Sequence, residues 1–101
     1  MGVLDMIAGR PVATPHDQAL AHADNGVAIY WRPRCPYTAR LRVAIRAQRH
    51  RARWVNIWED EAGRVYVASV NDGDETVPTV VIDGVPHTNP PPTLVRAALS
   101  R

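Results

Sequence analysis

The stretch VAIYWRPRCPYT, residues 27–38, decides the fold class of this chain. Its first five residues form an apolar run rich in β-forming side chains, which predicts a short buried strand. Pro33 breaks that strand, and Pro36 suits the first position of a helix, where its missing N–H costs nothing. Cys35 is therefore expected between the end of a buried strand and the start of a helix.

Beyond this junction, helices and strands alternate along the chain. We expect a helix over residues 36–50, a strand over 53–58, a helix that starts at the acidic residues 59–61, strands over 78–82 and 85–88 joined by a tight turn at residues 83–84, and a last helix capped by Asn89. The order β-α-β-α-β-β-α predicts an α/β fold with a four-stranded mixed sheet and helices on both faces.

The first part of the chain differs from the rest. Pro11 and Pro15 interrupt an apolar start at residues 1–10, and residues 16–25 are expected to form a short helix that ends before Gly26. We therefore interpret residues 1–26 as an N-terminal extension and residues 27–101 as one domain.

Composition restricts the class of protein. At 101 residues with 46% hydrophobic residues, the chain suits one globular domain, and a net charge of +2 is too small to indicate a nucleic-acid partner. With no apolar run long enough for a bilayer and no secretory signal, a cytoplasmic protein without a membrane partner is expected. All twelve basic residues are arginines and phenylalanine is absent, which suggests the coding bias of a GC-rich bacterium.

A single cysteine excludes an intramolecular disulfide and a site built on paired thiolates. The four histidines show no metal-ligand spacing, so no metal is expected. At the start of a helix, Cys35 meets unpaired backbone N–H groups, and Arg32 and Arg34 add positive charge; both effects favour a reactive thiolate. Position alone equally fits a small buried hydrophobic side chain.

A set of motifs favours the reactive thiolate over the buried hydrophobic side chain. Cys35-Pro36-Tyr37-Thr38, followed by Thr76-Val77-Pro78-Thr79 and Asp83-Gly84, resembles a glutaredoxin of the thioredoxin fold. The resemblance covers about residues 27–99 and is closest to the mycoredoxin-like branch of actinobacteria, to which residues 71–78 and 88–90 are also similar. It implies a thiol–disulfide oxidoreductase of cell redox homeostasis, with Cys35 as the nucleophile and a cis Val77–Pro78 peptide facing it.

The resemblance also implies the remaining site. Tyr37 would pack on a small thiol, Pro36 and Thr38 would surround the thiolate, and the expected binding residues are Tyr37, Thr76, Val77, Pro78, Thr88 and Asn89. Thr38 stands where many members carry a second cysteine, so a monothiol mechanism is expected, because attack on a mixed disulfide needs only one protein sulfur. Mycothiol or glutathione would be the co-substrate, with no bound cofactor, and the partners would be proteins carrying mixed disulfides and an upstream disulfide reductase.

Two alternatives remain. An iron–sulfur cluster carrier would also have one cysteine, but those relatives have Gly where Pro36 stands. A non-catalytic thioredoxin-fold interaction module would use none of this chemistry. The arginines of the first long helix and the next strand (42, 46, 49 and 53) are interpreted as a solvated face, and the tryptophans are interpreted as core or strand-edge packing: Trp31, Trp54 and Trp58.

Overall fold

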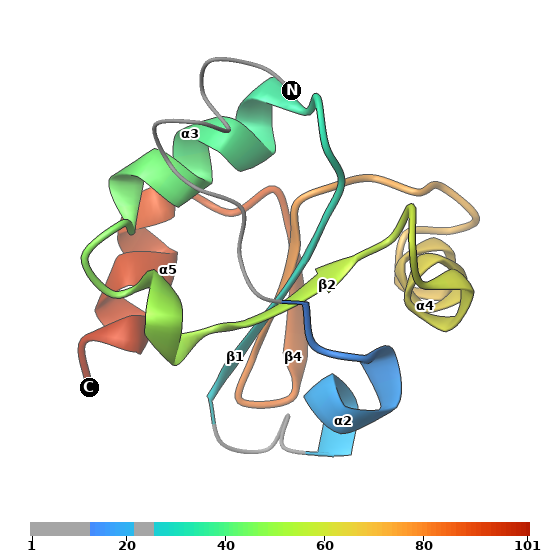
Figure 1. Ribbon diagram of the computed structural model, residues 1–101, viewed down its shortest axis with the longest axis horizontal. Helices are drawn as coiled ribbons and strands as arrows, with labels where there is room; N and C mark the ends of the chain where they lie inside the picture. The colour runs from blue at the N-terminus through green and yellow to red at the C-terminus, as the bar shows by residue number, and fades with distance from the viewer. Residues whose placement is uncertain (1–12, 22–25) are drawn as a thin grey trace.

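The computed structural model describes residues 13–21 and 26–101, and its centre is a four-stranded sheet in the order β2-β1-β3-β4 (Figure 1). Strand β1 (Val27–Trp31) runs parallel to β2 (Arg53–Asn56) and antiparallel to β3 (Thr79–Ile82). Strand β4 (Val85–Thr88) pairs antiparallel with β3. The predicted α/β fold with a mixed sheet is confirmed.

Helices cover both faces of this sheet (Figure 1). On one face lie α3 (Pro36–Ala44) and α5 (Pro92–Leu99), and on the other lie α2 (His16–Ala21) and α4 (Glu61–Val70). Because side chains alternate along a strand, β1 supplies both cores: Val27, Ile29 and Trp31 pack with α3 and α5, whereas Ala28 and Tyr30 pack on the opposite face. The burial of β1 on both faces explains its continuous apolar sequence.

The described part of the N-terminal segment packs on the sheet. Ala19 of α2 is fully buried, and the backbone N–H of Thr14 donates to the carbonyl of Trp54 in β2 at 2.7 Å. His16 Nδ1 lies 2.9 Å from the hydroxyl of Tyr30. Burial, together with the nearby Tyr66 and Asp60, raises the pKa of Tyr30 far above its ordinary value.

The expected short helix over residues 16–25 is seen as α2, and its last residues, 22–25, lie outside the described residues. The apolar start expected at residues 1–10 also lies outside them. Among the residues that are described, no helix is both long enough and apolar enough to cross a membrane.

Helix α3 ends at Ala44, so the prediction that it continues to His50 is wrong. The N–H of Arg46 already bonds three residues back, to the carbonyl of Val43, and residues 49–51 form a separate 3₁₀ turn. Trp54 explains this early end: it is buried in β2, and its indole N–H donates to the carbonyl of Arg49 at 2.9 Å. This tertiary contact fixes the turn before β2.

Arg42 also departs from its prediction as part of a solvated face. It is 2% exposed, and its guanidinium carbon lies 5.2 Å from the centre of a Trp31 ring. An arginine can be buried in this way because its planar cation stacks on an aromatic face.

Asn89 does not cap the last helix, contrary to prediction. The helix begins three residues later, with Pro91 at the N-cap and Pro92 at the first helical position. Asn89 instead has a left-handed φ of +45°, and its N–H donates to the carbonyl of Pro78 at 2.8 Å. Asn tolerates this conformation better than most residues, so it turns the chain beside Pro78.

Candidate functional site

Cys35 occupies the junction between β1 and α3, as predicted. Arg34 before it has a left-handed φ of +65°, which turns the chain out of the strand direction. Cys35 is then the N-cap of α3, its carbonyl accepting from the N–H of Ala39 at 3.0 Å. Its side chain stands at the end of the helix where N–H groups lack intrahelical partners, and the sulfur makes no capping hydrogen bond to them.

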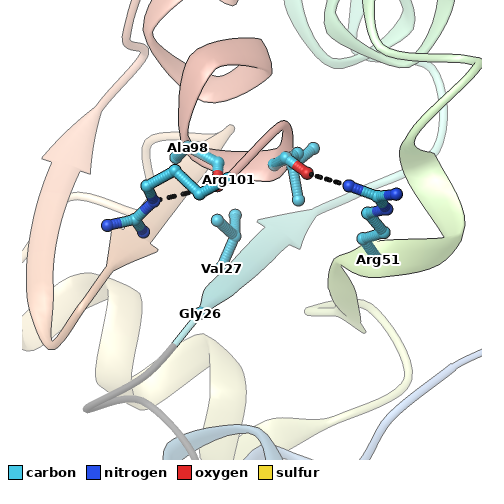
Figure 2. Close-up of a pocket in the computed structure, with 6 residues that line it drawn as sticks. Gly26, Val27, Arg51, Ala98 and Arg101 are labelled. Carbon is cyan, nitrogen blue, oxygen red and sulfur yellow. Dashed lines mark hydrogen bonds between the residues drawn. The ribbon is translucent and has the colours of Figure 1, made fainter.

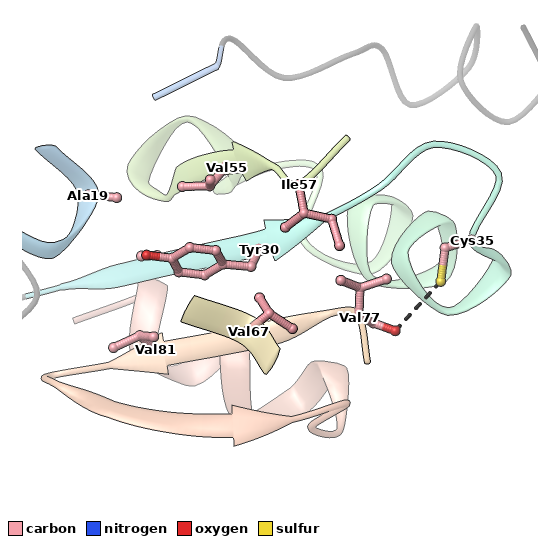
Figure 3. Close-up of a cluster of buried hydrophobic side chains, with 9 residues drawn as sticks. Ala19, Tyr30, Cys35, Val55, Ile57, Val67, Val77 and Val81 are labelled. Atoms are coloured by element: carbon pink, nitrogen blue, oxygen red, sulfur yellow. Dashed lines mark hydrogen bonds between the residues drawn. The ribbon is translucent and has the colours of Figure 1, made fainter. Parts of the chain in front are cut away.

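The thiol faces the segment before β3. Cys35 is 5% exposed, and its S–H donates to the carbonyl oxygen of Val77 at 3.6 Å (Figure 3). The Val77–Pro78 peptide is cis, as the resemblance implies. The side chains of Cys35 and Val77 belong to the buried cluster that also contains Ile57, and they lie at the end of that cluster shown on the right of Figure 3. The fold therefore brings a thiol and a backbone carbonyl together, although the two residues lie 42 positions apart in the sequence.

The residues that follow Cys35 divide between surface and interior. Pro36 is exposed at the first helical position, and Tyr37 is 54% exposed beside the thiol in sequence. Thr38 is 1% exposed, and its hydroxyl has no hydrogen-bond partner among the described residues. Position 38 therefore points into the fold, while Tyr37 remains available to a ligand.

Trp58 is a residue that sequence reasoning missed. The expectation that it packs in the core or at a strand edge is wrong, because it is 57% exposed. Strand β2 ends at Asn56, whose side-chain oxygen accepts from the N–H of Trp58 at 2.9 Å, so the chain has already turned outward. The guanidinium carbon of Arg32 lies 5.7 Å from the centre of the Trp58 ring.

The parallel pairing of β1 and β2 is the signal that could have found Trp58. Parallel strands end at the same edge of a sheet, so residues just past β2 lie beside residues just past β1. The N–H of Ile57 confirms this continuation by donating to the carbonyl of Trp31 at 2.9 Å. Arg32 and Trp58 thus form a stacked pair close to the thiol junction, which we call the Arg32–Trp58 pair.

The other predicted binding residues lie around Pro78. The hydroxyl of Thr79 donates to the carbonyl of Thr76 at 2.8 Å, and Asn89 contacts Pro78 through the backbone bond described above. The hydroxyl of Thr88 donates instead to the side-chain oxygen of Asn71. Thr76 and Asn89 therefore flank the segment that faces Cys35, whereas the Thr88 hydroxyl is used within the fold.

Two pockets lined by described residues are separate from this thiol. One of about 380 Å³ is lined by the start of β1 and the end of α5 (Figure 2). Since Cys35 follows the other end of β1, this pocket lies at the opposite edge of the sheet. A second pocket of about 320 Å³ lies between residues 13–15 and the loop after β2, where it is lined by Asn56, Glu59 and Asp60. Within the described ranges, no group of three or more His, Cys, Asp or Glu side chains could hold a metal ion.

Three features define a protein of the thioredoxin-fold class. The mixed sheet has the strand order β2-β1-β3-β4, and a thiol is the N-cap of the helix that follows β1. A cis-proline lies opposite that thiol. The family model described as Glutaredoxin matches residues 27–87. Two proteins of Mycobacterium tuberculosis, "Putative glutaredoxin Rv3198A" (strain H37Rv) and "Putative glutaredoxin MT3292" (strain CDC 1551 / Oshkosh), are each 40% identical to this chain over 74 residues, or 72% of this chain and 88% of the relative. The chain therefore belongs to the glutaredoxin family.

Proposed function

We propose that this protein is a thiol–disulfide oxidoreductase that reduces protein mixed disulfides by a monothiol mechanism. One observation carries the proposal: the only cysteine of the sequence is the N-cap of α3, with its sulfur 3.6 Å from the Val77 carbonyl. Residues 27–101 would carry this activity as a glutaredoxin-like domain, with residues 1–26 as an extension. The reaction requires a reduced thiol and therefore a reducing compartment, which we take to be the cytoplasm.

The first step is attack of the Cys35 thiolate on the small-thiol sulfur of a mixed disulfide. A new disulfide forms between Cys35 and the small thiol, and the bond to the protein substrate breaks. The electron pair leaves on the substrate sulfur, which takes a proton from solvent. The backbone N–H groups at the start of α3 stabilise the attacking anion.

The second step regenerates Cys35 with an external thiol, because the chain holds no second cysteine. A second small-thiol anion attacks the small-thiol sulfur of the adduct, forms the symmetric disulfide and releases the Cys35 thiolate. An upstream reductase would then reduce the symmetric disulfide. The small thiol is mycothiol or glutathione in this proposal.

Two exposed aromatic side chains support a binding surface for the small thiol. Tyr37 follows Cys35 by two positions, and the Arg32–Trp58 pair lies just past the ends of β1 and β2. An aromatic face buries apolar area, while a guanidinium offers donors to carboxylate, amide or hydroxyl oxygens. Val77, whose carbonyl bonds only weakly to a thiol, would pair with the extended backbone of the substrate.

The test is a covalent adduct at Cys35. The reduced protein is incubated at neutral pH with the symmetric disulfide of mycothiol or of glutathione, and the intact mass is measured. One adduct per chain is expected, removed by excess small thiol and absent from the matched Cys35→Ser variant. If neither disulfide gives an adduct, the oxidoreductase proposal is wrong and the non-catalytic interaction module is favoured.

Turnover then identifies the co-substrate. Reduction of a peptide mixed disulfide is compared for the mycothiol and glutathione forms, with the corresponding free thiol as reductant. The better substrate is expected to have a clearly higher kcat/KM. Adduct formation without turnover would contradict the second step, in which an external thiol regenerates Cys35.

A further inference from the structure

We propose that Asn71 is a positioning residue that sets the substrate-binding edge at Val77 through a hydrogen-bond relay. This inference rests on the proposed function, since it assigns a role in binding the mixed disulfide. Asn71 follows α4 and touches neither Cys35 nor Val77 in the contacts of its side chain. Its influence would be transmitted through Thr79 and Thr76.

The amide of Asn71 joins separate elements. Its Nδ2 donates to the carbonyl of Val67 in α4 at 2.9 Å and to the hydroxyl of Thr79 in β3 at 3.1 Å. Its Oδ1 accepts from the hydroxyl of Thr88 in β4. Thr79 and Thr88 are direct partners in the β3–β4 pairing, so one side chain connects a helix end to a pair of adjacent strands.

The relay continues from Thr79 toward the site. Thr79 is fully buried, and its hydroxyl donates to the carbonyl of Thr76 at 2.8 Å while it accepts from Asn71. Because a hydroxyl has a single proton, the bond from Asn71 leaves that proton directed at Thr76. Hydrogen bonds in such a chain reinforce one another in a buried environment.

The carbonyl of Thr76 belongs to the same peptide plane as the N–H of Val77. Fixing this carbonyl therefore fixes the direction of the Val77 N–H, one of the two backbone groups that an added strand would use. The other group is the Val77 carbonyl, which lies against the Cys35 thiol. Loss of the relay should leave Cys35 in place while the edge opposite it changes orientation.

A structural role without positioning is the competing explanation, and the contact pattern separates the two. Thr79→Val removes the relay hydroxyl with little change of shape, whereas Thr79→Ser retains it. Asn71→Ala removes both ends of the amide contact. Ser69→Ala is the matched control, because it removes a side-chain hydrogen bond to a carbonyl of α4 but leaves the path from Asn71 through Thr79 intact.

The experiment compares a peptide mixed disulfide with iodoacetamide, which alkylates Cys35 without needing a strand edge. Thr79→Val and Asn71→Ala are expected to raise KM for the peptide substrate about fivefold, the loss of one net hydrogen bond, with kcat and the alkylation rate within about twofold of wild type. Thr79→Ser and Ser69→Ala should stay within about twofold in KM. The double variant Asn71→Ala/Thr79→Val should equal the single variants, because both break one path.

An unchanged KM in Thr79→Val would overturn the proposal, as would equal losses in KM and alkylation rate. A second measurement does not depend on turnover: the amide resonance of Val77 in a ¹⁵N-labelled protein should shift or broaden in Thr79→Val and remain near its wild-type position in Thr79→Ser. If wild type shows no adduct but this pattern of resonances appears, the oxidoreductase proposal fails while the relay stands. An unmoved Val77 resonance refutes the relay itself.

Discussion

Replacement of Trp58 by alanine tests whether the exposed Arg32–Trp58 pair binds the small thiol. Trp58 is 57% exposed, so its removal creates no core cavity and should lower the free energy of unfolding by no more than about 1 kcal/mol, the contribution of the exposed contact with Arg32. The Arg32 guanidinium, 5.7 Å from the ring, loses this contact and keeps its hydrogen bond to the carbonyl of Pro33. A contact of similar strength between this exposed pair and the bound small thiol would contribute about 0.5–1 kcal/mol to binding, which corresponds to a factor of roughly 2–5 in affinity.

The assay measures KM and kcat for a peptide mixed disulfide carrying the small thiol. Trp58→Ala is expected to raise KM about two- to fivefold while kcat stays within about twofold, because the ring is not placed to contact the reacting sulfurs. Trp58→Phe, which keeps an aromatic face, should fall between the variant and wild type. The rate of Cys35 alkylation by iodoacetamide should be unaffected, since this reagent involves no small thiol.

A matched control is available at the other end of the sheet. Val85 is 56% exposed and pairs with Ile82, which itself pairs with Val27 at the start of β1, far from Cys35. Val85→Ala should leave KM unchanged. If Trp58→Ala behaves like Val85→Ala, the binding surface proposed at the Arg32–Trp58 pair does not exist, and Trp58 is a solvent-exposed side chain without a role in this reaction.

Two further predictions concern stability, measured by urea denaturation. Gly63→Ala should lower the free energy of unfolding by about 1–2 kcal/mol, because the added Cβ would lie 2.7 Å from a methyl carbon of the buried Val55. This overpacking outweighs the better helix propensity of alanine. The double variant Gly63→Ala/Val55→Ala should lose less stability than the sum of the two single variants. Tyr30→Phe should cost about 1 kcal/mol at pH 8 through the lost bond to His16, yet lose less stability than wild type between pH 9 and 11. The pKa of Tyr30 is raised by burial, so above the ordinary tyrosine value the unfolded chain ionises while the folded one does not, and stability present at lower pH is lost as pH rises. Equal alkaline losses in the variant and wild type would contradict this reasoning.

The sheet could be predicted from local signals. An apolar run predicts β1 because both of its faces are buried, and Asp83-Gly84 predicts the β3–β4 hairpin because both residues adopt the positive φ that such a turn requires. The start of α3 could also be predicted from a local signal, because the ring of Pro36 fixes a backbone angle that suits the first helical position. Each of these features depends on residues adjacent in sequence.

The features that could not be predicted depend on contacts between different segments of the fold. Helix α3 ends early because Trp54 bonds the carbonyl of Arg49 from another element, and Arg42 is buried because Trp31 offers its ring. Asn89 is a residue type that favours helix N-caps, but its N–H donates to the carbonyl of Pro78. In all three positions a tertiary contact outweighs the local preference.

The candidate site shows the same division. Cys35 and the residues that follow it could be located from the sequence, because they lie on one short junction. The thiol's partner could not be located from spacing alone, since Val77 lies 42 residues away and reaches the sulfur only through the pairing of β1 with β3. The exposed Trp58 likewise depends on the parallel pairing of β1 with β2.

Thr38 explains why the proposed mechanism uses one protein sulfur. In the proposed reaction a dithiol route would need a second sulfur near Cys35, and position 38 is directed into the interior at 1% exposure, where this chain holds a hydroxyl. A neutral hydroxyl does not attack a disulfide at neutral pH. In the proposed reaction the Cys35 adduct is therefore reduced by a thiol from solvent. That thiol must reach the sulfur of Cys35, a residue that is only 5% exposed, beside the exposed Tyr37. The surface around Tyr37 and the Arg32–Trp58 pair would therefore influence both steps, first by holding the small thiol of the substrate and then by admitting the one that releases it.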